Sequence, residues 1–185
     1  DASGSSSTVT FNGAQDQYIS QATFVNVAFA GSGLKTLQSN LTVLGNFAIS
    51  GEANVDAETN AIYVGGNWGH IGTGLFSHAG NGNTYFNGSG TQTVTMPPSN
   101  ASAFNIFRID KPIGTDIEIL SDITVKRHIY FTEDGGDLNL GNHTLTFGGD
   151  FYTRPGSDFI WTAGAKLIAN GAAEDQLLRN YNPNT

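Results

Sequence analysis

A short internal repeat constrains the fold of this chain more than any other feature of its sequence. The segment Thr42–Phe47 (TVLGNF) resembles Tyr63–Trp68 (YVGGNW), 21 residues further on, and Thr124–Ile129 resembles Thr146–Phe151 after 22 residues. In each copy a short strand-forming stretch precedes a turn, and a large apolar residue follows the turn. A repeat of this length is typical of one turn of a β-solenoid, which needs two or three short strands and their corners.

A longer repeat of about 80 residues contains the short one. Its clearest landmark occurs three times, the last time weakly: Phe11–Gly13 with Gln17, Phe86–Gly88 with Gln92, and Ala169–Gly171 with Gln176. Three further landmarks recur in the same order: Phe24–Phe29 with Phe104–Ile109, Ser39–Val43 with Ser121–Val125, and Gly65–Trp68 with Gly148–Phe151. We therefore expect one repeat domain at 8–176, built of units 8–88 and 89–171, between a flexible leader at 1–7 and a linker or cap at 177–185.

Short segments rich in Val, Ile, Thr, Phe and Tyr, bounded by Gly, Asn, Asp, Ser and Pro, predict many short strands. These segments are 8–11, 41–43, 47–49, 61–64, 84–86, 92–95, 117–119, 123–125, 128–131, 138–140 and 144–147. A helix of one or two turns is expected only at Ala172–Arg179. The chain is therefore predicted to be all-β.

Two all-β architectures fit this pattern. The first is a right-handed parallel β-helix (β-solenoid) with turns of about 21 residues, of which the chain would hold about eight or nine. Val43 would then stack on Val64 and Phe47 on Trp68, about 4.8 Å apart, with Asn or Thr ladders over the corners. The alternative is two tandem immunoglobulin-like β-sandwiches, because each long unit has a suitable size. The nested short repeat favours the solenoid, because sandwich strands need no such period.

Composition excludes several classes of protein. The 185 residues carry 16 acidic and 8 basic side chains, a net charge of −8, so a nucleic-acid partner is not expected. The absence of Cys excludes disulfides and thiolate metal sites, and no apolar run is long enough to suggest membrane insertion. A chain rich in Thr, Asn and Gly but poor in Lys fits an extracellular location on a bacterial surface.

Several strings resemble the repeats of large secreted surface proteins of Bacteroidota, which are often exported by the type IX system. These are TVTFNGAQDQYI, NLTVLGNFAISG, AIYVGGNWGHIGTGLF, TYFNGSGTQTV and LNLGNHTLTFGGDF, and the resemblance extends from Thr8 to about Gln176. It implies a β-helical repeat module of an adhesin or another cell-surface protein, and it supplies no catalytic motif. Segments 97–103 and 172–185 depart from the repeat.

One glycine-rich turn gathers carboxylates and gives a candidate metal site. Its acidic residues Glu133, Asp134 and Asp137 offer the hard oxygen ligands that calcium prefers. Their spacing matches neither an EF-hand loop nor the calcium-binding nonapeptide of β-rolls. An ordinary solvated turn is the simpler interpretation, and no other cofactor is expected.

Catalytic patterns are weak. The four histidines lack metal-ligand spacing, and we expect them at turns or on the surface: His70, His78, His128 and His143. A polysaccharide-cleaving β-helix enzyme would need a base and nearby cations, and Lys126–His128 is the one basic cluster in the sequence. We therefore expect no enzyme.

Tyrosines give the candidate ligand-binding residues. Tyr63, Tyr85, Tyr130 and Tyr152 alternate with apolar neighbours, so some of them should face outward. Outward Tyr beside Asn and Thr could stack on sugars while neighbouring groups bind sugar hydroxyls. The simpler interpretation is that Tyr and Thr favour strands.

These features predict a non-enzymatic structural or adhesive repeat module of an extracellular bacterial surface protein. The alternative is a carbohydrate-binding module, assisted by calcium if the acidic turn binds it, and a polysaccharide-cleaving enzyme is less favoured. The expected partners are neighbouring repeats or domains of a larger protein, further copies of the chain, and glycans.

Overall fold

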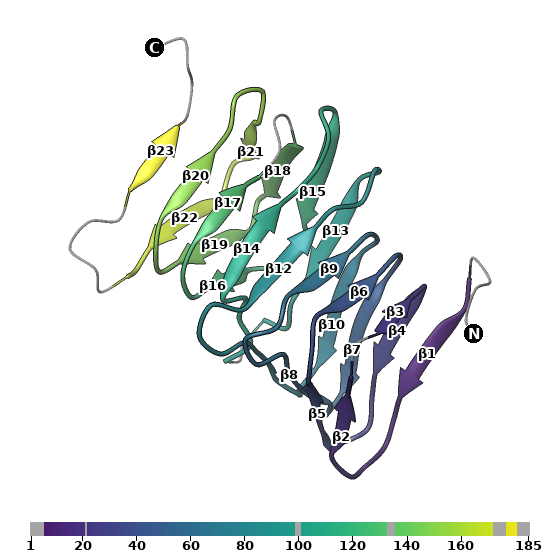
Figure 1. Ribbon diagram of the computed structural model, residues 1–185. Coiled ribbons are helices and arrows are strands. Elements are labelled where there is room, and N and C mark those ends of the chain that lie inside the picture. Colours follow the sequence, from purple (N-terminus) through teal and green to yellow (C-terminus); the bar gives the residue numbers. More distant parts are fainter. Residues whose placement is uncertain (1–5, 21, 99–100, 133–135, 172–176, 181–185) are drawn as a thin grey trace.

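The chain forms a parallel β-solenoid with a spacing of about 21 residues from turn to turn, the fold that the short repeat predicts (Figure 1). The computed structural model describes residues 6–20, 22–98, 101–132, 136–171 and 177–180. All of its paired strands are parallel. This excludes immunoglobulin-like sandwiches, whose sheets are antiparallel. The helix expected at Ala172–Arg179 is wrong in its described part, because Leu178 and Arg179 belong to a strand.

Each turn of the coil contributes one short strand to each of two faces, and all described turns except that of β13 and β14 add a strand on a third face. Sheet A is the first face: β1 (Thr8–Phe11), β4 (Asn26–Phe29), β7 (Phe47–Gly51), β10 (Trp68–Gly72), β13 (Gln92–Thr95), β15 (Thr115–Ile119), β18 (Gly136–Gly141) and β21 (Phe159–Trp161). Sheet C is the second: β3 (Ala22–Phe24), β6 (Leu41–Val43), β9 (Ile62–Val64), β12 (Asn83–Phe86), β14 (Ile106–Ile109), β17 (Ile129–Phe131), β20 (Phe151–Thr153) and β23 (Leu178–Asn180).

The third face is divided between two sheets. Sheet B covers its first part: β2 (Gln17–Ile19), β5 (Leu34–Leu37), β8 (Asn54–Asp56) and β11 (Phe76–Ser77). Sheet D covers its last part: β16 (Ile123–Val125), β19 (Thr144–Phe147) and β22 (Lys166–Ala169). Between them Phe104 forms an isolated parallel bridge with Val125, and the Ala103 N–H donates to Phe76 O at 3.4 Å. The interruption falls at segment 97–103, which departs from the repeat.

The turns near this interruption are longer than most of the others. Most corner bonds elsewhere join residues 18 to 22 apart, such as Asn46 with Asn67, which are 21 apart. The corresponding bond from Asn67 reaches Thr93, 26 residues on. Sheets A and C nevertheless hold eight strands each, so the described chain forms eight rungs, within the eight to nine that the short period predicted.

The landmarks of the long repeat lie on different faces of the coil. Segment Ser39–Val43 ends in β6 of sheet C, whereas its match Ser121–Val125 ends in β16 of sheet D. Likewise the corner motif at Phe11–Gly13 follows a strand of sheet A, and Phe86–Gly88 follows a strand of sheet C. The two units of the long repeat therefore share a strand–corner–strand motif, but in the second unit this motif lies on a neighbouring face of the coil.

Both corner motifs enclose a buried lysine. In each motif the glycine N–H donates to the glutamine four residues on, Gly13 to Gln17 Oε1 at 3.0 Å and Gly88 to Gln92 Oε1 at 2.8 Å. One turn later a lysine bonds the glycine carbonyl through Nζ, Lys35 to Gly13 O at 2.9 Å and Lys111 to Gly88 O at 2.8 Å.

These lysines are fully buried, and further oxygens complete their surroundings. Lys35 Nζ also donates to Gly33 O at 2.7 Å, and Lys111 Nζ donates to Gly90 O at 2.7 Å and Gln92 Oε1 at 3.1 Å. Burial lowers the pKa of Lys111, and the negative charge of Asp116 opposes this shift only in part, so that the pKa is about 8. The ammonium groups therefore satisfy carbonyls that the tight corners would otherwise leave unpaired.

Asparagine ladders join the corners of successive turns, as expected, and aspartates accept the same bond at other corners. The Asn26 Oδ1 accepts the N–H of Asn46, the Asn46 Oδ1 accepts that of Asn67, and the Asn67 Oδ1 accepts that of Thr93, each at 2.8 Å. The same bond recurs at other corners, from Leu34 to Asp16, Ala61 to Asn40, Leu75 to Asn54, Thr144 to Asp122 and Asp158 to Asp137. Short acceptor side chains at these sites therefore take over the backbone bonding where the strands end.

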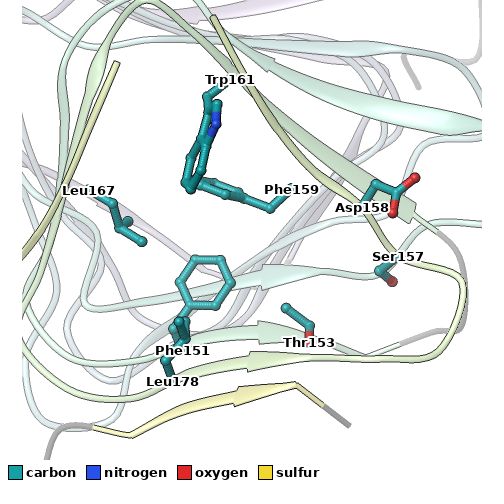
Figure 2. Close-up of a pocket in the computed structure, with 8 residues that line it drawn as sticks. All are labelled: Phe151, Thr153, Ser157, Asp158, Phe159, Trp161, Leu167 and Leu178. Atoms are coloured by element: carbon teal, nitrogen blue, oxygen red, sulfur yellow. The ribbon is translucent and has the colours of Figure 1, made fainter. Parts of the chain in front are cut away.

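The last turn of the coil leaves core-type side chains uncovered (Figure 2). Phe159, Leu167 and Leu178 pair with the buried residues Leu138, Leu145 and Phe151 and continue their inward ladders. Nevertheless Leu178 is 69% exposed and the neighbouring Trp161 is 59% exposed. These residues line an open cavity of about 280 Å³.

Inward aromatic side chains stack from turn to turn and fill the core. The ring centroids of Phe11 and Phe29 are 5.5 Å apart, those of Phe29 and Phe47 are 5.3 Å apart, and those of Phe47 and Trp68 are 4.1 Å apart. The predicted pairs Val43 with Val64 and Phe47 with Trp68 are confirmed. Such stacking combines apolar burial with favourable ring geometry.

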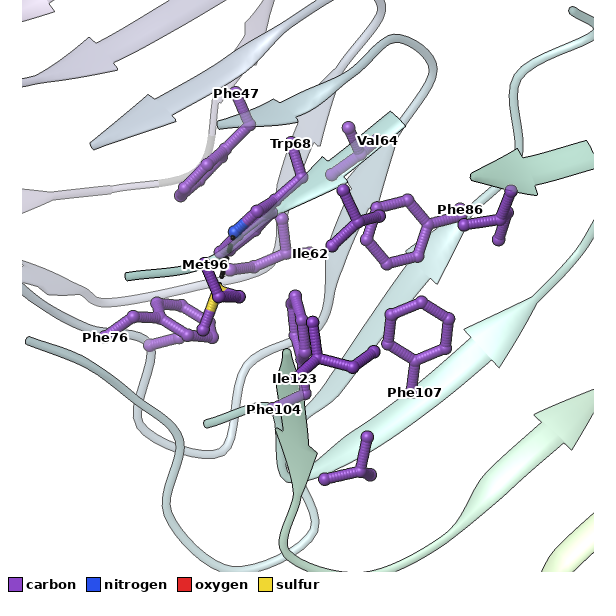
Figure 3. Close-up of a cluster of buried hydrophobic side chains, with 14 of the residues drawn as sticks. Phe47, Ile62, Val64, Trp68, Phe76, Phe86, Met96, Phe104, Phe107 and Ile123 are labelled. Carbon is purple, nitrogen blue, oxygen red and sulfur yellow. Dashed lines mark hydrogen bonds between the residues drawn. The ribbon is translucent and has the colours of Figure 1, made fainter. Parts of the chain in front are cut away.

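Around Trp68 the core widens into a cluster of rings next to the interrupted third face (Figure 3). Phe76, Phe86 and Phe104 lie edge-on to the indole, with centroids 4.7 to 6.4 Å away. The indole N–H donates to the sulfur of Met96 at 3.2 Å (Figure 3). The large side chains therefore fill the space where sheets B and D fail to meet.

Replacing Lys111 by Met tests the buried ammonium. The variant keeps the length of the side chain but removes the hydrogen bonds to Gly88 O, Gly90 O and Gln92 Oε1, so we expect the free energy of unfolding to fall by about 2–4 kcal/mol. The matched control Lys126→Met, at an exposed lysine, should change it by less than about 0.5 kcal/mol. Urea denaturation at pH 7 measures both, and equal losses would contradict the structural role of Lys111.

Candidate functional site

The four candidate tyrosines lie in one row on the outer face of sheet C. Tyr63 pairs with Tyr85, and Tyr130 pairs with Tyr152, on neighbouring parallel strands. Arg108 occupies the position between the two pairs, opposite Tyr85 on one side and Tyr130 on the other. All five side chains are half-buried. Since parallel pairing keeps equivalent residues on the same face, we call these five residues the tyrosine–arginine ladder.

The rings of this ladder stack on one another. The Tyr63 and Tyr85 centroids are 4.6 Å apart with planes at 15°, and the Tyr130 and Tyr152 centroids are 4.7 Å apart with planes at 7°. The Arg108 guanidinium lies over both inner rings, 5.3 Å from the Tyr85 centroid and 4.6 Å from that of Tyr130. Arginine suits this position because its flat cation can contact an aromatic ring on each side.

Polar groups beside the ladder fix its members. Arg108 Nε donates to Asn83 Oδ1 at 2.7 Å, and the Tyr152 hydroxyl donates to Asp150 Oδ2 at 2.6 Å. Asp150 Oδ1 also accepts the Leu177 N–H at 3.1 Å. The backbone N–H of Asp150 donates to His128 Nδ1 at 2.9 Å. This bond places His128 in a corner ladder, as expected for a turn residue.

This geometry decides what the ladder can offer to a ligand. Both faces of Tyr85 and Tyr130 are covered, because each ring lies between another tyrosine and Arg108. Sugar stacking on these two rings would require an open ring face. The outward parts of the ladder are therefore the ring edges and the polar ends of the side chains, which suit hydrogen bonding to a ligand lying across the sheet.

Sequence reasoning found the tyrosines but missed Arg108. The signal was present, since Arg108 lies 23 residues after Tyr85 and 22 before Tyr130, close to the length of one turn. A search restricted to aromatic residues could not find it. Because Arg108 lies between Tyr85 and Tyr130, the five side chains form one continuous stack, and the two inner rings have no open face.

The acidic turn is described only in part. Glu133 and Asp134 lie outside the described residues, and Asp137 faces outward on β18. Asp116 pairs with Asp137 on the neighbouring strand, and the Asp158 N–H donates to Asp137 Oδ1 at 2.7 Å. Partial burial and the like charges of Asp158 and Asp116 raise the pKa of Asp137. Among the described residues, no three His, Asp or Glu side chains are grouped to hold a metal ion.

Two of the four histidines lie inside the coil, so the expectation that all would be surface or turn residues is wrong for them. His70 is fully buried, pairs with Ile49, and places Nε2 3.0 Å from Gly74 O. His78 is 7% exposed and lies edge-on to Phe76, with ring centroids 5.0 Å apart. Burial lowers the pKa of both rings, that of His78 to about 4. Both are therefore core residues that are neutral at pH 7.

A hollow of about 520 Å³ lies beside the interruption of the third face. Its walls include Ile71 and Leu120, which are 65% and 50% exposed. At its edge His143 Nδ1 lies 3.8 Å from Asp122 Oδ1. The break in the repeat thus concentrates apolar surface beside a polar pair, away from the tyrosine–arginine ladder.

Comparisons with known proteins give no match: no protein-family model, no curated protein and no solved structure matches the chain. In the part of the chain that the structure describes, no helix is long and apolar enough to cross a membrane. The function of the chain is therefore inferred from its own geometry and chemistry.

Replacing Arg108 by Met tests the stacking within the ladder. The variant removes the cation from between two rings and the bond to Asn83, so we expect the free energy of unfolding to fall by about 1–2 kcal/mol. Lys126→Met, which removes an exposed cation outside the ladder, is the control and should change it by less than about 0.5 kcal/mol. Urea denaturation compares them, and a neutral Arg108 variant would show that the stack adds no stability.

Acid should destabilise the fold through His78. Its pKa is about 4 in the folded chain, below the ordinary value of 6.5. The stability that comes from keeping the ring neutral is therefore complete above pH 6.5. It is lost progressively as the pH falls from 6.5 to the folded-state pKa of about 4. The loss amounts to at most about 3 kcal/mol. Denaturation at pH 7 and pH 4 should show that His78→Leu weakens this pH dependence, and an unchanged dependence would contradict the assignment.

Proposed function

We propose that the chain is a non-enzymatic structural and adhesive repeat module of an extracellular bacterial surface protein. The observation that carries this proposal is the stacking of every turn on the next, from β1 at one end to β23 at the other. A coil of this kind grows by adding turns, and each turn contacts its neighbours through the same ladders. It thereby holds its outer faces in a fixed row, which suits a spacer that displays a binding surface.

Surface chemistry and sequence both support the extracellular assignment. The net charge of −8 favours solubility, and the polar surface relies on 19 Thr and 18 Asn rather than on Lys. The strings quoted above resemble the repeats of secreted surface proteins of Bacteroidota, and those strings include the strands and corners that build the coil. Neighbouring repeats or domains of a larger protein are therefore its proposed partners within the same chain.

A carbohydrate-binding module is the second candidate, and the tyrosine–arginine ladder favours it. The ladder offers polar groups at intervals of one turn along sheet C, including the Tyr152 hydroxyl and the Arg108 guanidinium. A glycan chain lying along the coil could form hydrogen bonds with successive groups. The acidic turn at Glu133, Asp134 and Asp137 is the place where calcium would assist such binding.

Labelling intact source cells tests the first candidate. Antibodies raised against the purified chain should label the cell surface, and brief protease treatment of intact cells should remove the label. Added soluble chain should also compete with the cells for the surface to which they adhere. Label that appears only after the cells are opened would contradict the extracellular assignment.

A glycan array tests the second candidate, once with calcium and once with chelator. Binding through the ladder predicts that the combined change of Arg108→Ala and Tyr152→Ala weakens binding at least about tenfold. The control Thr10→Ala changes an exposed residue on sheet A and should leave binding unchanged. Loss of binding in chelator would implicate the acidic turn, and an array without binding would contradict this candidate.

A further inference from the structure

The four arginines of the chain all lie on or beside sheet C. Arg108 belongs to β14 and Arg179 to β23, Arg127 comes two residues before β17, and Arg154 directly follows β20. This gathering stands out in a chain whose 16 acidic side chains outnumber its 8 basic ones. Positive charge is therefore concentrated along one face of the coil.

Acidic side chains lie on a different face. On β15 the buried Ile117 and Ile119 point inward, so Asp116 and Glu118 face outward on sheet A. Asp137 pairs with Asp116 on the neighbouring strand of the same sheet. The negative net charge of the chain therefore does not prevent an anion from approaching sheet C.

One short segment of the coil, 80–83, holds two of the arginines. Arg108 Nε donates to Asn83 Oδ1 at 2.7 Å, and Arg127 Nη1 donates to Gly80 O at 3.2 Å and to Asn81 Oδ1. The two guanidinium groups come from successive turns of the coil, and their shared partner segment brings them to the same edge of sheet C. All of these partner atoms are neutral oxygens.

The charges of these two arginines are not compensated by carboxylates. In the part of the chain that the structure describes, neither Arg108 nor Arg127 forms an ion pair with Asp or Glu. Their field reaches the neighbouring His128: burial lowers its pKa most, Arg127 and Arg108 lower it further, and the charge of Asp150 raises it. A cation that is half-buried without a counter-charge, as Arg108 is, gains by binding an anion.

The rings on either side of Arg108 add further hydrogen-bonding groups. Tyr85 and Tyr130 carry their hydroxyls at the outward ends of the stacked rings, and among the described residues neither hydroxyl has a hydrogen-bond partner. Asn83 occupies only the Nε of Arg108, so its terminal N–H groups are also available. Because the two rings hold the plane of the guanidinium, little side-chain entropy is lost on binding.

We propose that Arg108 and Arg127, together with the hydroxyls of Tyr85 and Tyr130, bind the acidic groups of an anionic polysaccharide that lies along sheet C. A carboxylate and a sulfate both offer paired oxygens that arginine can contact through two N–H groups. We rest this inference on the carbohydrate-binding candidate above, and it specifies the chemical class of the ligand at that site.

The covered ring faces favour a polysaccharide over a nucleic acid. Proteins that bind single strands stack the bases on open aromatic faces, whereas both faces of Tyr85 and Tyr130 are occupied. A duplex would need a row of cations along its phosphates, whereas the next positions of the tyrosine–arginine ladder are the uncharged Tyr63 and Tyr152.

Binding to immobilised polymers tests the proposal, with polygalacturonate as the carboxylate, dextran sulfate as the sulfate and dextran as the neutral control. The chain should bind at least one acidic polymer at least about tenfold more tightly than dextran. Arg108→Gln and Arg127→Gln should each weaken this binding at least about tenfold. The matched control Lys166→Gln removes the same charge from an exposed residue of β22, on sheet D, and should bind like the parent chain.

Removing the two hydroxyls alone tests the site without opening the stack. The double variant Tyr85→Phe with Tyr130→Phe keeps both rings and should weaken binding about threefold to tenfold. Tyr18→Phe removes a hydroxyl from a residue of sheet B that is 67% exposed, and it should bind like the parent chain. Circular dichroism checks that each variant is folded, and the exposed Arg127 gives a variant outside the stack.

Four results would overturn the proposal. Binding that Arg127→Gln leaves unchanged, or that Lys166→Gln weakens equally, would show that these arginines form no site. Equal binding to dextran would contradict the acidic ligand while the carbohydrate-binding candidate stands. Failure to bind any of the three polymers would contradict this inference alone, because the glycan array tests the broader candidate separately. A single-stranded DNA oligonucleotide that binds as tightly as the acidic polymers would contradict the polysaccharide class.

Discussion

Every feature of this molecule depends on the contact between a residue and its equivalent one turn away. Along the strands this contact is a parallel backbone ladder, and at the corners it is a side-chain oxygen such as that of Asn46 accepting the next N–H. Inside the coil it is the stack of Phe47 on Trp68, and on the outer face of sheet C it is the stack of Tyr130 on Tyr152. Backbone pairing therefore fixes both the core and the candidate site.

The architecture could be predicted because stacking leaves a period in the sequence. Matching Thr42–Phe47 with Tyr63–Trp68 was enough to place Val43 on Val64 and to expect asparagine ladders. The short strands of sheet B, such as β2 and β5, were missed because their apolar alternation is broken by Gln17 and Lys35, polar residues that point inward. Lys35 is buried there because corner carbonyls bind its ammonium group, a requirement that no apolar pattern reveals.

The same limit applies to the candidate site. The alternation of Tyr63, Tyr85, Tyr130 and Tyr152 with apolar neighbours showed that they could face outward, but it could not show that their rings would cover one another. His70 and His78 were expected at turns or on the surface, yet both occupy inward positions. In each case the missing information was which neighbour a side chain meets one turn away.

Faces and ends of the coil have different physical roles. The faces are closed by ladders, so a ligand can reach only ring edges and polar groups there. In the described end turns the ladders run to one side only, and inward side chains such as Leu178 are correspondingly more exposed.

Hydrogen exchange in dilute solution, measured by mass spectrometry on overlapping peptides, tests this dependence on stacking most directly. If each turn is held by its two neighbours, amides of the middle turns, from β10 to β14, should exchange most slowly. Exchange should become faster toward β1–β3 and β21–β23, whose turns have one neighbour each. Slowest exchange in an end turn, or equal protection along the whole coil, would contradict the account.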